Sequence, residues 1–486
     1  PRDDRKFIVF ESSLKKLFKV CRTCYAPCKS VSRVSGTMLK VQTLCAKNHC
    51  LLWRSQPVMN GKAAGNVLMS AGILFTGASP TSVLRTLEHI NIQVFTLRTF
   101  HNYQRGYLLP AINKIWREQQ EELFLQLEGQ EVDLAGDGRC DSPGFSAKYM
   151  TYSLHAAQLN KIIHFEQVQV GECAAVKSST SMEKHAFLKC LEKVKDRGLS
   201  VVSMTTDRHV QIAKHMRTEE PTIRHYFDGW HISKGIKKKL AAQAKRAGCS
   251  VLDVWIQPAS NHLFWCAALS DGNQELLLDM WKSVQNHVAN KHTDHPGLYT
   301  HCAHEDLGER EWLVPGTRAH DKFVEVTMAP RLLKDIRQLA PSTHTFSLEA
   351  FHSVLIGFAP KSVCFSSDGM RARTQLAILH FNENANREQA VSADGSLQFK
   401  IKHPKSRKGV KVVRPKQADP TYNYVDLLLT ETEKCCKLWR SFRIAFAANK
   451  SAAPPPMSHS FPGPSKAELV ATRRSRFATG SGRTSL

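Results

Sequence analysis

Three acidic residues at widely separated positions are the side chains of this sequence best suited to hold catalytic metal ions. Asp137 lies in Gly-Asp-Gly-Arg at the end of an extended segment, and Asp207 follows a buried strand. Glu349 lies in Phe-Ser-Leu-Glu-Ala-Phe-His, on a segment with helical spacing. Carboxylates from separate elements can hold two divalent ions about 3.5–4 Å apart, which activate an attacking and a leaving oxygen. The sequence therefore predicts a Mg²⁺ or Mn²⁺ site for nucleic-acid strand cleavage and transfer.

The first acidic position is open between two aspartates. Asp133 and Asp137 are four residues apart, so both face the same side of an extended strand. Asp137 is the first choice because its glycine neighbours leave room for metal and phosphate, and Asp133 is the alternative. Glu349, taken alone, also fits an ordinary surface glutamate.

A mixed α/β core is needed to bring these acids together. Extended apolar stretches predict three strands in succession, then a helix, then the acid-bearing strands that precede Asp207 and Asp228. This order resembles that of an RNase H-like fold. The first three strands are expected over 131–139, 148–154 and 162–170, a later strand over 222–227, and core helices over 181–197, 346–358 and 368–386.

Two close pairs of cysteines near the start of the chain predict a structural metal site. Cys21 and Cys24 form one pair, and the second pair begins at Cys45 in Cys-Ala-Lys-Asn-His-Cys. Thiolates on two tight turns joined by a hairpin suit tetrahedral zinc. The spacing resembles a zinc ribbon or treble clef, and the fourth ligand is His49 or Cys50.

Positive charge is in large excess. Lysine and arginine total 67 against 43 acidic residues, which gives a formal net charge of +24. This excess favours a polyanionic partner, most simply DNA, through neutralisation of phosphates. A basic helix over 236–247 and a basic run over 400–416 are the expected contacts, although the run also fits a nuclear-import signal or a solvated linker. The residues expected to bind DNA are Lys237, Lys238, Lys239, Lys405, Arg407 and Lys408.

Composition argues against two other classes of protein. No run of about 18 apolar residues predicts a membrane span, and no signal-peptide pattern opens the chain. The 14 cysteines of a chain without a secretion signal indicate reduced thiols and metal ligands rather than a disulfide framework.

A short motif after the second acid carries a resemblance to a known group of enzymes. Asp228-Gly-Trp-His231 begins 21 residues after Asp207. In this place it resembles the signature of cut-and-paste DNA transposases of the Mutator, Kolobok and hAT-like superfamilies. The resemblance implies an RNase H-like DDE/D domain in which Asp137, Asp207 and Glu349 hold Mg²⁺ or Mn²⁺. It also implies that Asp228 and His231 support the site, and that a helical insertion precedes Glu349.

These observations predict a nuclear DNA transposase, or a transposase-derived protein, that cleaves DNA strands and joins them with divalent metal ions. The resemblance implies transposon ends and target DNA as partners, a homo-oligomeric state, and a reader domain upstream of some relatives. Whether this chain is truncated before its first residue, Pro1, stays open. A domesticated DNA-binding protein without activity and an RNase H-like nuclease that does not join strands are the alternatives.

The helical insertion carries scattered metal-ligand side chains. They are His262, Cys266, His287, His292, Cys302 and His304, and their irregular spacing leaves a second zinc site open. The expected organisation is a zinc-ribbon-like domain (1–60), a helical DNA-binding or dimerisation segment (61–129), the first part of an RNase H-like catalytic core (130–249), the helical insertion (250–340), the second part of the core (341–395), a basic C-terminal segment (396–447) and a disordered tail (448–486).

Overall fold

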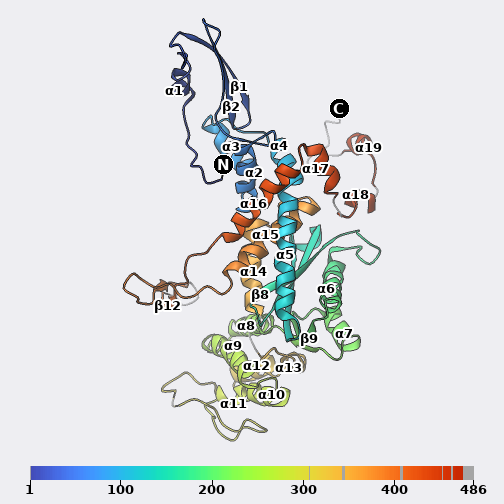
Figure 1. The fold of residues 1–486 in the computed structure, drawn as a ribbon. Helices are drawn as coiled ribbons and strands as arrows, with labels where there is room; N and C mark the ends of the chain where they lie inside the picture. The colour runs from blue at the N-terminus through green and yellow to red at the C-terminus, as the bar shows by residue number, and fades with distance from the viewer. Residues whose placement is uncertain are drawn as a thin grey trace, which may run out of the picture.

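The computed structural model describes residues 2–305, 307–341, 345–404, 409–450, 453–460 and 463–473. Figure 1 shows a small N-terminal sheet at one end, a central body around the long helix α5, and a helical lobe at the other end. The fold is mixed α/β, as the sequence predicts. No helix among the described residues combines the length and apolar character needed to cross a membrane.

The N-terminal sheet has three antiparallel strands in the order β1-β2-β3. From Val41 on, the central strand buries alternate side chains, namely Val41, Thr43 and Cys45, as expected for a sheet with one covered face. Phe18 packs on Trp53 with ring centroids 5.1 Å apart. The elements are α1 (Glu11–Lys16), β1 (Cys28–Ser35), β2 (Met38–Cys45) and β3 (Cys50–Arg54).

A helical segment links this sheet to the central body and confirms the helices predicted for residues 61–129. Ser79 caps the second helix, since its hydroxyl accepts a hydrogen bond from the Ser82 backbone N–H at 3.3 Å. The elements are β4 (Val58–Met59), β5 (Lys62–Ala63), α2 (Ala64–Phe75), α3 (Pro80–His89), α4 (Leu97–Tyr103), a π-helical turn (Gln104–Leu108) and α5 (Leu109–Leu127).

A five-stranded mixed sheet in the order β8-β7-β6-β9-β10 lies at the centre of the body. β6, β7 and β8 pair antiparallel, whereas β9 runs parallel to β6 and β10 runs parallel to β9. The predicted succession of three strands, a helix and further strands is therefore confirmed. The elements are β6 (Glu131–Cys140), β7 (Tyr149–Ala156), β8 (Lys161–Gln169), α6 (Ser179–Asp196), β9 (Ser200–Thr206), α7 (Val210–Thr218) and β10 (Arg224–Phe227).

Side chains of this sheet alternate between two apolar cores. Ala135 and Tyr149 pack with α5 and two later helices on one face, while Leu134 and Met150 pack with α6 and α7 on the other. Because both faces are covered, β7 is buried along its whole length. The two helices that complete the first core are α14 (Thr345–Phe358) and α15 (Ser367–Asn384).

The helical lobe interrupts the chain between β10 and α14 and has an apolar core of its own, with Trp281 and Phe323 fully buried. The two ends of the lobe lie side by side. The backbone of Phe227 accepts a hydrogen bond from Ala340 N at 3.1 Å and donates one to Gln338 O at 2.5 Å. The elements are α8 (Gly229–Ala244), α9 (Leu252–Leu269), α10 (Gln274–Lys282), α11 (Val284–His287), α12 (Arg318–Thr327) and α13 (Pro330–Ile336). The basic helix predicted over 236–247 begins earlier, at Gly229, because Asp228 caps it.

The basic C-terminal segment predicted over 396–447 contains a helix that packs on the central body. Helix α16 buries Tyr424, Leu428 and Cys436 against the central body, and Lys114 on α5 pairs with Glu431 at 2.9 Å. Its apolar face was not recognised in the sequence because it follows a long basic run. The elements are β11 (Phe399–Lys402), β12 (Val412–Pro415), α16 (Asn423–Leu438) and α17 (Phe442–Ala448).

The tail predicted to be disordered over 448–486 contains two short helices in its described part. They are α18 (Met457–Ser460) and α19 (Lys466–Ala471). Ser465 and Glu468 form a reciprocal capping box at the start of α19, which explains why a helix begins there. Residues 474–486 lie outside the described residues.

Candidate functional site

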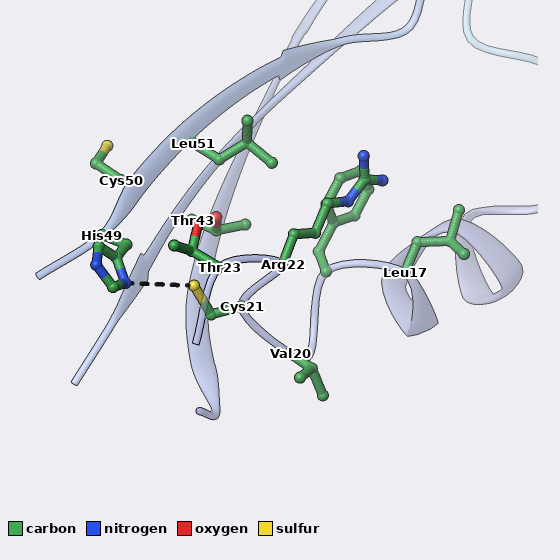
Figure 2. Close-up of a pocket in the computed structure, with 10 residues that line it drawn as sticks. Leu17, Val20, Cys21, Arg22, Thr23, Thr43, His49, Cys50 and Leu51 are labelled. Carbon is green, nitrogen blue, oxygen red and sulfur yellow. Dashed lines mark hydrogen bonds between the residues drawn. The ribbon is translucent and has the colours of Figure 1, made fainter. Parts of the chain in front are cut away.

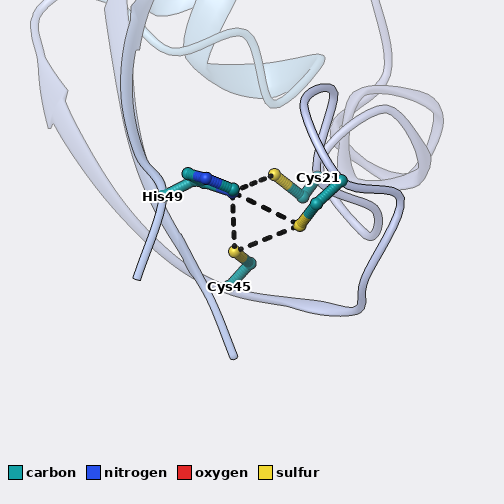
Figure 3. Close-up of side chains that lie close together, drawn as sticks. Cys21, Cys45 and His49 are labelled. Atoms are coloured by element: carbon teal, nitrogen blue, oxygen red, sulfur yellow. Dashed lines mark hydrogen bonds between the residues drawn. The ribbon is translucent and has the colours of Figure 1, made fainter. Parts of the chain in front are cut away.

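The predicted N-terminal metal ligands converge on one point. Cys21, Cys24, Cys45 and His49 present one ligand atom each, and these atoms all lie within 4.8 Å of one another. His49 Nδ1 lies 3.7 Å from Cys21 Sγ, 3.3 Å from Cys24 Sγ and 3.6 Å from Cys45 Sγ. Figure 3 shows the imidazole and the thiols pointing toward this common centre.

These separations are the edges of a tetrahedron of zinc size. Bonds of about 2.3 Å to sulfur and about 2.0–2.1 Å to nitrogen give edges of about 3.5–3.8 Å, and Cys24 Sγ lies 3.6 Å from Cys45 Sγ. The four side chains could therefore hold a zinc ion, and the predicted set is confirmed as a group. Cys50, the alternative fourth ligand, is exposed and lies outside the group.

Local backbone geometry places these ligands. Asn48 has a φ of 59°, a left-handed conformation that asparagine tolerates, and its N–H donates to Cys45 O at 2.9 Å. This turn brings His49 back over Cys45. Backbone N–H groups of Thr23 and Cys24 lower the pKa of Cys21 to about 6, which favours the thiolate. A hollow of 110 Å³ opens beside the cluster, and Figure 2 shows Cys21 and His49 lining it.

The predicted acidic residues lie at the ends of adjacent parallel strands. Asp137 lies near the end of β6, Asp207 directly follows β9, and Asp228 directly follows β10. Since these strands run parallel, their carboxyl ends meet at one edge of the sheet. Asp207 Oδ1 accepts a hydrogen bond from His209 N at 3.0 Å. The fold therefore delivers three carboxylates to one place.

The supporting pair predicted from the motif is joined by a direct contact. Asp228 Oδ2 lies 2.8 Å from His231 Nδ1, and its other oxygen accepts from Trp230 N at 3.1 Å. Asp228 is buried and begins α8. The hydrogen bond to Asp228 raises the pKa of His231. The spacing of Asp-x-x-His thus places an N-cap carboxylate and an imidazole on the first turn of one helix.

Asp137 is in an unfavourable environment for a negative charge. Burial, and after it the charge of Asp207, raises the pKa of Asp137 to about 7. The charge of Asp228 acts in the same direction, whereas a hydrogen bond from Gly138 N and the charge of His231 oppose it. Asp137, Asp207, Asp228 and His231 therefore form one electrostatic group.

Glu183 on α6 belongs to the same group, and the sequence reasoning missed it. Burial, followed by the charges of Asp207 and Asp137, raises the pKa of Glu183 to about 8. The signal in the sequence is its spacing, since Glu183 lies four residues before the buried Phe187 and seven before the buried Cys190. Because the buried side of α6 packs against the central sheet, a glutamate on that side lies against the sheet.

The glycines beside Asp137 lie against side chains of neighbouring elements. A Cβ on Gly138 would lie 3.1 Å from Met150 Sδ and 3.2 Å from Glu183 Cγ. One on Gly136 would lie 2.7 Å from the Tyr152 hydroxyl. The space beside the glycines is thus filled by side chains. The absence of a Cβ at Gly138 lets Glu183 approach β6.

Helix α14 brings Glu349 and His352 to this edge of the sheet. His352 Nδ1 lies 3.4 Å from Asp137 Oδ2, and burial lowers the pKa of this histidine to about 4. The pKa of Glu349 is raised by burial and then by the charge of Asp228. Arg139 ties the end of the helix to β6 by donating to Ala359 O at 2.6 Å. Glu349 thus approaches the site from the side of Asp228.

The carboxylates are neighbours but are not drawn into direct contact. Within the described part of the chain, groups of three or more ligand atoms within 4.8 Å of one another occur at the N-terminal cluster and in the helical lobe. Asp133, the alternative first acid, is engaged elsewhere, since it accepts hydrogen bonds from the Ser203 hydroxyl and from Gln158 Nε2.

Of the residues predicted to bind DNA, the structure describes Lys237, Lys238 and Lys239. Lys237 donates to Gln257 Oε1 at 3.0 Å, and Lys238 and Lys239 are exposed on α8. The basic run predicted over 400–416 includes a two-stranded antiparallel hairpin, β11-β12, that projects from the body in Figure 1. The predicted contacts Lys405, Arg407 and Lys408 lie outside the described residues.

Similarity to known proteins is found among solved structures. No protein-family model matches the chain, and no curated protein matches it. Among solved structures, the chain is similar to the Drosophila P element transposase strand transfer complex, with a TM-score of 0.28 and 12% identity. The similarity covers 67% of this chain and 94% of that chain. A TM-score this low carries no argument about fold or function.

Proposed function

We propose that the protein is a DNA transposase, or a transposase-derived protein, whose RNase H-like core cleaves and joins DNA strands with divalent metal ions. The observation that carries the proposal is the gathering of Asp137, Asp207 and Asp228 at adjacent strand ends, with Glu183 and Glu349 supplied by packed helices. The sheet order supports it, since three antiparallel strands followed by two parallel ones is the arrangement that an RNase H-like core requires.

The donor set fits Mg²⁺ or Mn²⁺. Burial and the charges of Asp207 and Asp228 raise the pKa of Asp137, so its ionised state is unfavourable without a cation, and oxygen ligands are those that magnesium prefers. Asp137, Asp207 and Glu349 would hold the ions, with Glu183 as a further carboxylate beside the first two. Two bound ions would stabilise the charge on attacking and leaving oxygens during phosphoryl transfer.

The histidines of the site orient the acids. His352 is uncharged near neutral pH because its pKa is about 4. Its Nδ1 lies 3.4 Å from Asp137 Oδ2, so a neutral imidazole would limit the orientations of that carboxylate without adding a positive charge that competes with a metal. His231 is held by Asp228, and the latter also caps α8. Asp228 and His231 therefore support the site while remaining outside the proposed ligand set.

We propose that DNA binds along helix α8, which begins next to Asp228. α8 starts at the site and carries Trp230, which is 40% exposed, with Lys234 4.4 Å from the centre of its ring. Lys238 and Lys239 follow on the same helix. A basic helix that starts beside carboxylates can contact phosphates on either side of the cleaved bond. We also propose a nuclear location and a homo-oligomeric state.

Strand cleavage is the experiment that tests this function. Full-length protein is incubated with Mg²⁺ or Mn²⁺ and a labelled duplex that carries the sequences flanking its coding region. The proposal expects nicked products, then products joined to target DNA through a 3′-hydroxyl, and neither product in EDTA. Cleavage without joining would support the RNase H-like nuclease, and DNA binding without any cleavage would support the inactive DNA-binding protein.

Magnesium is expected to stabilise the protein more at about pH 8 than at about pH 5.5. The pKa values of Asp137 and Glu183 are raised to about 7 and about 8, so the folded chain binds more protons than the unfolded chain between about pH 4, where such carboxyls titrate when unfolded, and those values. Stability without metal therefore falls as pH rises through this range. A cation that binds the ionised carboxylates offsets that loss only at the higher pH.

Thermal unfolding with and without Mg²⁺ at the two pH values measures this effect. The charged groups that face the two acids are Asp207, Asp228 and His231, and none of them is altered in the matched control, Asp133→Asn. That control should show the wild-type response. A magnesium-induced rise in Tm of the same size at both pH values would contradict the expectation.

A further inference from the structure

Four side chains of the helical lobe converge far from the acidic site. They are His287, His292, Cys302 and His304, and their ligand atoms all lie within 4.8 Å of one another. Cys302 Sγ lies 3.6 Å and His304 Nε2 lies 3.3 Å from His287 Nδ1. Only His287 lies on a helix, at the end of α11. The other three come from the irregular segment 288–317.

These distances fit a tetrahedral metal centre. Bonds of about 2.0–2.1 Å to nitrogen and about 2.3 Å to sulfur give edges of about 3.3–3.4 Å between two nitrogens and about 3.5–3.6 Å between nitrogen and sulfur. The measured separations match both kinds of edge. One thiolate with three imidazoles is a donor set that suits zinc.

Neighbouring groups hold the ligands in a metal-binding orientation. His292 Nε2 lies 3.0 Å from Asn290 Oδ1, and His304 Nδ1 donates to Glu305 O at 2.7 Å. Each contact leaves the opposite ring nitrogen free to face the centre. His295 Nε2 lies 3.3 Å from Cys302 Sγ. Such outer contacts fix the tautomer and direction of metal-binding histidines.

His292 supplies an independent sign of a missing ligand. Its Nδ1 atom is buried and has no hydrogen-bond partner among the described residues. A buried ring nitrogen without a partner is unfavourable, and a metal ion at the centre of the four side chains would satisfy it. Trp312 packs edge-on against His292, with ring centroids 5.4 Å apart, and also against His287 at 6.0 Å. The indole ring of Trp312 thus lies against two of the four ligands.

The chain path explains why the sequence spacing looked irregular. α11 ends at His287, and Asn290 has a left-handed φ of 58° that reverses the chain. His292 therefore meets His287 without sharing a helical face with it. His262 and Cys266 belong elsewhere, since His262 Nε2 lies 3.4 Å from Cys266 Sγ and 2.8 Å from Met280 O.

We propose that His287, His292, Cys302 and His304 bind a structural zinc ion that fastens the irregular segment 288–317 to the helical lobe. All four positions of the tetrahedron are filled by protein, which is typical of structural rather than catalytic zinc. The bonds close a loop in a segment that has no helix or strand within its described residues. The site is independent of the proposed DNA chemistry.

Zinc content and sulfur coordination test the proposal on the full chain. Purified wild-type protein is expected to hold about two zinc ions, one in each cluster. Cys45→Ser removes the N-terminal site and should leave about one, with X-ray absorption at the zinc edge showing one sulfur and three nitrogen neighbours. A Cys45→Ser protein without zinc, or with sulfur-rich coordination, would overturn the proposal.

Variants in the lobe give a second, matched readout. In the Cys45→Ser background, Cys302→Ser and the substitution of the exposed His304→Ala should each abolish the remaining zinc. His301→Ala, which alters the exposed residue next to Cys302, should keep it. Retention of zinc in both Cys302→Ser and His304→Ala would contradict the assignment, whatever the fold of these variants.

Discussion

Asp207→Asn is expected to abolish metal-dependent cleavage and joining of DNA while leaving DNA binding within about twofold of wild type. The substitution keeps the shape of the side chain and an oxygen for the His209 N–H, but it removes the charge that a metal ion needs. Metal ions supply several kcal/mol of transition-state stabilisation, and each 1.36 kcal/mol is a factor of about ten in rate. The rate should therefore fall by about 10³-fold or more.

The matched control for this prediction is Asp133→Asn. Asp133 lies on β6 as Asp137 does, but it is engaged by Ser203 and Gln158. The control should therefore cleave DNA at a rate close to wild type. Equal activity in Asp207→Asn and wild type would remove Asp207 from the site, and loss of activity in Asp133→Asn alone would move the first acid to Asp133.

Loss of the N-terminal zinc is expected to unfold the three-stranded sheet β1-β2-β3. The sheet has a small core that includes Phe18, Met38 and Val41, whereas structural zinc contributes about 10–16 kcal/mol of binding free energy. Cys24→Ser should therefore lose this zinc and the hydrogen-exchange protection of the strand amides. The central sheet, which has separate cores, should keep its protection.

Cys50→Ser is the control for this loss. Cys50 is exposed and lies outside the cluster, so its substitution should leave both zinc content and amide protection unchanged. If Cys24→Ser retained zinc and a protected sheet, the Cys₃His assignment would be wrong. If Cys50→Ser lost zinc instead, Cys50 rather than His49 would be the fourth ligand.

The strands of the central sheet could be predicted because burial on both faces leaves a strong local pattern. β7 is buried on both sides, and the motif Asp228-Gly-Trp-His231 encodes its own helix cap. The N-terminal cluster was equally visible, since paired cysteines on tight turns depend on local geometry. Each of these features depends on residues that are close together in the sequence, so it can be predicted from the sequence.

Other features depend on packing between distant segments and could not be predicted. Glu183 joins the acids only because α6 lies across β6, where Gly138 has no side chain. Helix α16 finds its partner in α5, some 300 residues earlier in the sequence. The four ligands of the helical lobe meet because the chain reverses at Asn290. In each case the deciding contact joins elements whose relative position no local pattern specifies.

The acidic site depends both on local sequence patterns and on packing between distant segments. Asp137 and Asp207 follow recognisable strands, and parallel pairing places them at one edge of the sheet. Glu349 required the resemblance to a family as well as the residues, because a single glutamate on a helix is not distinctive. The structure brings Glu349 near Asp228 and Glu183 near Asp137. Separate substitution of each glutamate by glutamine distinguishes a metal ligand from a neighbouring carboxylate.

Anomalous diffraction from crystals of the full chain grown with Mn²⁺ tests the central claim most directly. The account predicts manganese between the carboxylates of Asp137, Asp207 and Glu349, and its loss in Asp207→Asn crystals grown in the same way. Ordered carboxylates without manganese at saturating concentration, or manganese bound only at other sites, would contradict the proposed catalytic centre.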